Sequence, residues 1–171
     1  MTPRTTCLLA VALILGGCYR TSRFRGGTLS DSGLFSYPRY HASLQPLPLD
    51  TPARYAFPIS GLPSERMTLL FYVVGANHAA REALQAVSTP LQVSLDRVGT
   101  GPICSAQGSL GPSWVLMSNV HGAAFWQRVC TDLPIRSEAA YVLHVEVGSS
   151  ASAATHRMLV PTLEGGGNEL P

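Results

Sequence analysis

The chain has 171 residues, of which 46% are hydrophobic and 13% are charged, and its formal net charge is +2. This length suits one domain with a single core, and the composition is neither that of a disordered chain nor that of a polyelectrolyte. Nothing in the composition therefore predicts a nucleic-acid partner. All twelve basic residues are arginine, which excludes enzymes whose chemistry needs a lysine amine.

The first 17 residues have the pattern of a secretory signal peptide. Arg4 precedes an apolar run over residues 7–15, and two small residues, Gly16 and Gly17, follow it. The run is too short to serve as a stable transmembrane helix, which needs about 20 apolar residues. The sequence therefore predicts an exported protein whose leader is removed.

The residues Leu15-Gly16-Gly17-Cys18 resemble the lipobox of bacterial lipoproteins. The resemblance implies cleavage before Cys18 and lipidation of its thiol, with several acyl chains that hold the mature protein stably at a membrane. Because Tyr19, and not an aspartate, follows the cysteine, the same resemblance implies an outer-membrane location with the domain facing the periplasm. The alternative is an ordinary secretory leader cut near Gly17.

The two cysteines left after this processing are expected to form a disulfide. Cys7 lies in the leader and Cys18 carries the lipid, so Cys104 and Cys130 remain. An oxidising periplasm favours their oxidation, and the bond would close a loop of about 27 residues. The alternative is two separate buried thiols.

Residues 18–52 are predicted to form the lipidated N-terminus and a flexible tether. They are rich in Arg, Gly, Ser, Pro and Tyr and show no sustained apolar period. Arg20, Arg23 and Arg25 follow the lipidated cysteine and could contact anionic lipid head groups. A solvated basic linker is the alternative for these arginines.

Residues 53–163 are predicted to form an antiparallel β-sandwich of roughly seven to eight strands. Strand patterns occur at residues 55–59, 67–74, 91–96, 103–107, 114–118, 123–130 and 141–147. The segment 155–160 is expected to return as the hairpin partner of 141–147. One short helix is expected at residues 77–87, between the N-cap Asn77 and Pro90, and residues 164–171 are expected to be a disordered tail.

His144, Glu146 and His156 are the best candidates for a metal site. Residues two apart on a strand share a face, and a hairpin would bring His156 opposite His144, so that two imidazoles and a carboxylate could hold zinc. These residues can equally be ordinary solvent-facing strand residues. Trp114 and Trp126 are the candidates for a binding surface, although tryptophans also fill the core beside a disulfide. His78 and His121 have no local signature.

The function predicted from these features is that of a membrane-anchored, non-enzymatic binding or structural module. No motif for serine hydrolysis, metalloprotease chemistry or phosphate binding is present, and no cofactor is expected. The mature domain resembles small envelope β-sandwich lipoproteins of unknown function, and its partner would be a protein or another envelope component. The alternatives are a periplasmic immunity or inhibitor protein, a tethered hydrolase, and a carbohydrate-binding module.

Overall fold

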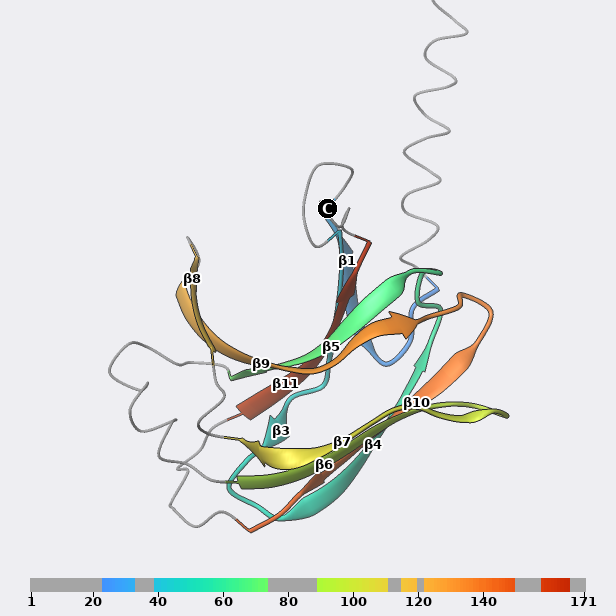
Figure 1. Ribbon diagram of the computed structural model, residues 1–171. Helices are drawn as coiled ribbons and strands as arrows, with labels where there is room; N and C mark the ends of the chain where they lie inside the picture. Colours follow the sequence, from blue (N-terminus) through green and yellow to red (C-terminus); the bar gives the residue numbers. More distant parts are fainter. Residues whose placement is uncertain are drawn as a thin grey trace, which may run out of the picture.

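The computed structural model describes residues 23–32, 39–73, 89–110, 115–119, 122–149 and 158–166. For residues 110, 115–119 and 122–127 it describes the course of the backbone only. The described part contains no helix, and its regular structure consists of β-strands that pair antiparallel (Figure 1).

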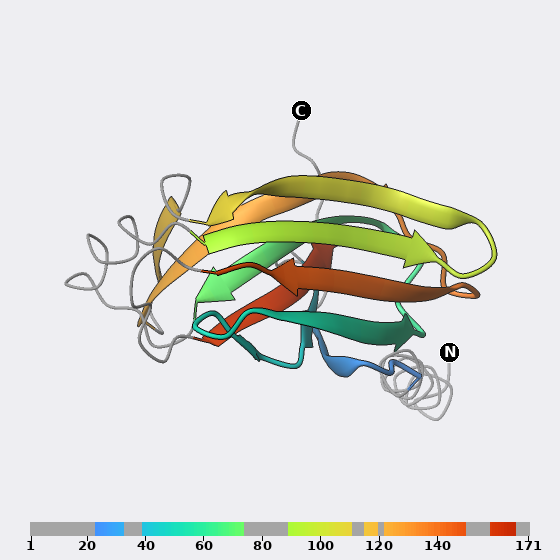
Figure 2. The ribbon, with the colours of Figure 1, turned by 90° about the horizontal axis from the view of Figure 1, so that it is seen from below.

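The strands form a sandwich of two sheets. They are β1 (Gly27–Asp31), β2 (Tyr40–Leu44), β3 (Leu47–Pro48), β4 (Ala53–Ser60), β5 (Arg66–Val73), β6 (Thr89–Arg97), β7 (Gly101–Leu110), β8 (Val115–Asn119), β9 (Gly122–Pro134), β10 (Ala140–Val147) and β11 (Met158–Gly165). The seven-stranded sheet, here called the large sheet, has the order β1-β2-β11-β5-β9-β8, with β3 also paired to β11. The four-stranded small sheet has the order β4-β10-β6-β7, and Figure 2 looks onto its outer face.

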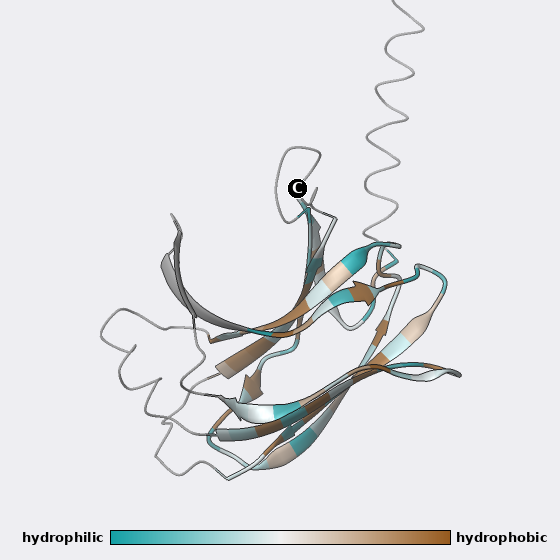
Figure 3. Ribbon diagram, in the orientation of Figure 1, coloured by the Kyte–Doolittle hydropathy of each residue, from teal (hydrophilic) through white to brown (hydrophobic). Residues whose placement is uncertain are grey.

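Alternation of apolar and polar residues explains why these segments form strands with one buried face. In β10, Tyr141, Leu143, Val145 and Val147 are buried, and the residues between them are not. β6 alternates in the same way, and Figure 3 shows hydrophobic and hydrophilic bands following one another along the small sheet. Successive side chains of a strand point to opposite faces, so each small-sheet strand sends one set into the core and leaves the other outside.

The predicted mainly-β sandwich is confirmed, but the described chain contains eleven strands rather than seven or eight. Most of the difference comes from the segment that was expected to be a tether. β1, β2 and β3 belong to the large sheet, and their neighbourhood buries Phe24, Tyr40, Ala42, Leu44, Leu47 and Leu49. The prediction of a flexible tether over residues 18–52 is therefore wrong for the part that forms β1, β2 and β3. Residues 40, 42 and 44 of β2 are apolar and alternate with polar residues, despite the Pro- and Ser-rich composition around them.

The expected hairpin between residues 141–147 and 155–160 is also wrong. β10 pairs with β4 and β6 in the small sheet, whereas β11 pairs with β2, β3 and β5 in the large sheet. Sequential strands therefore cross from one sheet to the other here, and no local pattern distinguishes that crossing from a hairpin. β11 also extends to Gly165, so the expected tail begins within a strand at Glu164.

Several predictions fall outside the described residues. They are the signal peptide over 1–17, the lipidated Cys18 and the helix over 77–87. In the described part of the chain, no helix has the length and apolar character needed to span a membrane.

Candidate functional site

The outer face of the small sheet carries polar side chains from all four of its strands. His144 and Glu146 lie two residues apart on β10, an inner strand of this sheet, and they share this face as the sequence predicts. The strand register aligns Arg54 and Gln92 on either side of Glu146, and Ala56 and Ser94 on either side of His144. Gln107 and Ser105 on β7 continue the two rows.

These rows form a groove of about 420 Å³, here called the polar groove. Its polar lining residues are Arg54, Gln92, Ser94, Ser105, Gln107, His144 and Glu146. Every one of them comes from a strand in regular pairing, so the sheet backbone fixes their spacing. The amides and hydroxyls both donate and accept hydrogen bonds, and the groove can therefore bind a ligand that presents both kinds of group.

The groove contains an ion pair. Arg54 contacts Glu146 through two nitrogens, with Nε–Oε2 at 3.0 Å and Nη2–Oε1 at 3.1 Å. Nε2 of His144 lies 3.8 Å from Oδ2 of Asp96. The side chain of Arg54 is 82% exposed, so the ion pair stays in water and contributes little to stability. The groove offers a nearly neutral, hydrogen-bonding surface.

The structure agrees with only one part of the metal-site prediction. His144 and Glu146 lie on one face, but Glu146 is held by Arg54, and His156 lies outside the described residues. The prediction needed a hairpin that would bring His156 opposite His144, and β11 instead lies in the other sheet. No group of three metal-ligating side chains occurs within the described residues.

Within the described residues, the serines of the groove do not form a nucleophile–base pair with His144. Ser94 is the register neighbour of His144, yet in the described chain neither Ser94 nor Ser105 donates a hydrogen bond to this imidazole. A serine nucleophile needs a base within hydrogen-bond reach.

The aromatic binding surface stays a prediction. Trp114 lies outside the described residues, and of Trp126 only the backbone position is described. This position lies in β9, in register with Tyr72 of β5 and with Val115 of β8.

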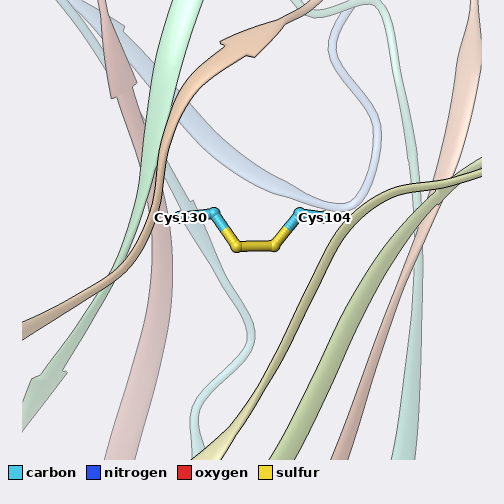
Figure 4. The surroundings of a disulfide bond; sticks show 2 residues. All are labelled: Cys104 and Cys130. Carbon is cyan, nitrogen blue, oxygen red and sulfur yellow. A yellow bond between two sulfur atoms is a disulfide. The ribbon is translucent and has the colours of Figure 1, made fainter.

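The predicted disulfide is present. Cys104 of β7 and Cys130 of β9 are bonded, with their Cα atoms 6.3 Å apart (Figure 4). Because β7 is the edge of the small sheet and β9 belongs to the large sheet, the bond joins the two layers of the sandwich.

Sequence reasoning missed a cluster on the outer face of the large sheet. One carboxylate oxygen, Oε1 of Glu164, accepts a hydrogen bond from the Tyr72 hydroxyl and lies 2.8 Å from Nδ1 of His41. Burial raises the pKa of Tyr72 above its ordinary value, and the hydrogen bond to Glu164 raises it further. These residues come from three strands that are distant in sequence, and two of them lie in the segments expected to be the tether and the tail.

Comparison with known proteins adds no functional assignment. No protein-family model and no curated protein sequence matches the chain. A solved structure, the CBM27-1 module of Caldicellulosiruptor saccharolyticus in complex with mannohexaose, is similar at 6% sequence identity and a TM-score of 0.43, over 80% of each chain. This likeness is too distant to carry an argument about ligands.

Proposed function

We propose that the protein is a lipid-anchored, non-catalytic binding module of the bacterial envelope, and that the polar groove of the small sheet is its binding face. The observation that carries this proposal is the open groove itself, in which four paired strands hold seven polar side chains without a nucleophile–base pair. Binding sites of this kind need a few polar groups held in fixed positions, and the strand register supplies them.

The proposed cellular location follows from the resemblance of residues 15–18 to a lipobox. The mature chain begins at Cys18, is held at the outer membrane by its acyl chains and faces the periplasm. Two observations agree with export: the leader pattern of residues 1–17 and the disulfide between Cys104 and Cys130. Disulfides persist in oxidising compartments such as the periplasm.

The groove chemistry favours a neutral polymer that is rich in amides and hydroxyls. Arg54 and Glu146 neutralise one another, and Gln92, Gln107 and the two serines offer donors and acceptors in rows across the strands. The glycan strands of peptidoglycan, which expose acetamido groups and hydroxyls to the periplasm, present this chemistry. We therefore assign these glycan strands as the ligand to be tested.

The test is co-sedimentation of the soluble mature chain, made with Cys18→Ser, with purified peptidoglycan sacculi. The groove variant combines Gln92→Ala with Gln107→Ala, and its control combines Thr28→Ala with Thr131→Ala on exposed positions of the large sheet. We expect the parent and the control to sediment with the sacculi and the groove variant to stay in solution. Equal sedimentation of all three chains, or of none, would overturn the assignment of the groove as a peptidoglycan site.

A further inference from the structure

The outer face of the small sheet changes character along its strands. Beyond the polar groove it becomes an apolar depression of about 640 Å³, here called the apolar end. Its outward apolar residues are Ala56, Pro58, Ala140, Val142 and Val98. Gln45 and Ser60 also line it, and Arg25 is the one charged residue among its lining residues. The same β10 strand thus presents Glu146 and His144 to the groove and Val142 and Ala140 to the apolar end.

Val98 is a strongly exposed hydrophobic residue at the apolar end. It lies in the β6–β7 turn and is 61% exposed, more than any other large hydrophobic residue in the described part of the chain. A lone exposed apolar residue needs no explanation, but Val98 borders a contiguous apolar depression. Val98 and this depression together expose apolar side chains that would be stabilised by leaving water.

The N-terminal segment joins the sandwich at this same place. Arg25 and Ser60 are paired by backbone hydrogen bonds, Ser60 is the register partner of Ala140, and the Val98 nitrogen donates to the Ala140 carbonyl at 3.0 Å. Arg25, Ser60, Ala140 and Val98 therefore form one continuous row across the end of the small sheet. Figure 2 shows the first described residues and the β6–β7 turn at this end.

The length of chain before this row limits how far it can lie from the membrane. Arg25 is seven positions after Cys18, and a fully extended chain spans at most about 3.6 Å per residue, or roughly 25 Å in all. Arg23 and Arg25 are exposed in the described part of this connection and carry charge that anionic head groups attract. An anchor on Cys18 thus holds an apolar surface with adjacent positive charge close to a bilayer.

We infer that the apolar end is a membrane-docking surface, with Val98 and its apolar neighbours entering the head-group region of the anionic bilayer that holds the lipid anchor. This inference rests on the proposed anchor at Cys18. Val142 and Glu146 are four residues apart on β10, so the groove lies about 13 Å from the docking surface along the strand. The anchor, the docking surface and the groove then follow one another along the domain.

The test is a depth measurement on the lipidated protein in vesicles of phosphatidylethanolamine and phosphatidylglycerol. Val98→Cys is labelled with an environment-sensitive fluorophore under non-reducing conditions, so that Cys104 and Cys130 stay bonded. The matched control is Thr51→Cys, an exposed position before the opposite end of β4. Flotation of the vesicles reports the anchor, and quenching by head-group-labelled nitroxide lipid reports docking.

We expect the protein to float with the vesicles, the label at position 98 to lose fluorescence with nitroxide lipid and to shift to the blue, and the label at position 51 to do neither. Flotation without preferential quenching at position 98 would overturn docking and leave the anchor intact. Failure to float would overturn the anchor and the docking together. A blue shift at position 98 that rises with the concentration of lipid-free Cys18→Ser chain would identify a second copy as the occupant and contradict the inference.

Discussion

Arg25 and Ser60 exchange two backbone hydrogen bonds, with N–O distances of 2.9 and 3.2 Å, and thereby extend the edge of the small sheet by one bridge. This contact fixes where the N-terminal segment enters the sandwich. Arg25 is seven positions after Cys18, the residue of the proposed lipid anchor.

Packing of the N-terminal strands is tested by substituting Gly27. A Cβ at this position would lie 2.0 Å from the Ser43 carbonyl oxygen, so Gly27→Val must push β1 away from β2. We expect a loss of about 1–3 kcal/mol in the free energy of unfolding, the usual cost of overpacking. Gly108→Val in β7 is the control, because a Cβ there meets nothing within 4 Å. Equal denaturation midpoints for the two variants would show that β1 contributes no stability.

Removal of the disulfide is expected to cost much of the domain's stability. Cys104 and Cys130 are 26 positions apart, and closing a loop of this size stabilises a fold by about 3.5 kcal/mol through the entropy of the unfolded chain. The double variant Cys104→Ala/Cys130→Ala should lose about 3.5 kcal/mol of the free energy of unfolding. It should therefore unfold at a lower denaturant concentration. If reduction of the parent chain leaves its denaturation midpoint unchanged, the bond does not stabilise the sandwich.

The Tyr72–Glu164 hydrogen bond gives stability a dependence on alkaline pH. The pKa of Tyr72 is raised in the folded protein, so the folded chain holds this proton more tightly than the unfolded chain, whose tyrosine titrates near pH 10. The stabilisation is complete below about pH 10 and is lost as pH rises toward the folded pKa. Tyr72→Phe should cost about 1 kcal/mol near neutral pH.

This cost should shrink above pH 10, and urea titrations of both chains across that range measure it. If the difference in the free energy of unfolding between the parent and Tyr72→Phe stays constant until the parent unfolds at alkaline pH, the raised pKa of Tyr72 is contradicted.

Arg54 and Glu146 are expected to matter for binding and little for stability. Their ion pair is largely exposed, at 82% and 42% of the two side chains, and such pairs contribute about 0–1 kcal/mol. Glu146→Gln should therefore leave the denaturation midpoint almost unchanged while it weakens sedimentation with sacculi. A loss of stability well above 1 kcal/mol would mean that the pair holds the sheet together and that its role in the groove is secondary.

The parts of the fold that were predictable from sequence are those that local alternation determines. Residues 91–96 and 141–147 alternate cleanly, and they lie in β6 and β10 as expected. The cysteine pair could be deduced by elimination once export was inferred. The strand predictions depend on patterns within a few residues. The disulfide prediction depends on redox chemistry, which does not require knowledge of the strand order.

The parts that were not predictable depend on pairing between distant strands. Glu164 was assigned to a tail, and only the placement of β11 between β2 and β5 brings it to His41 and Tyr72. The polar groove has the same origin, because Arg54, Gln92 and Glu146 become neighbours through register alone. Alternation tells which residues face outward, but it does not tell which strand lies beside which.

The most direct test of the whole account is the intact mass of the protein extracted from membranes, measured before and after reduction and alkylation, with Cys18→Ser as the control. The account predicts a lipidated species that begins at Cys18 and exposes two thiols only after reduction, and a Cys18→Ser chain without the lipid mass. A soluble product with no lipid on Cys18 would contradict the anchor, and with it the docking surface.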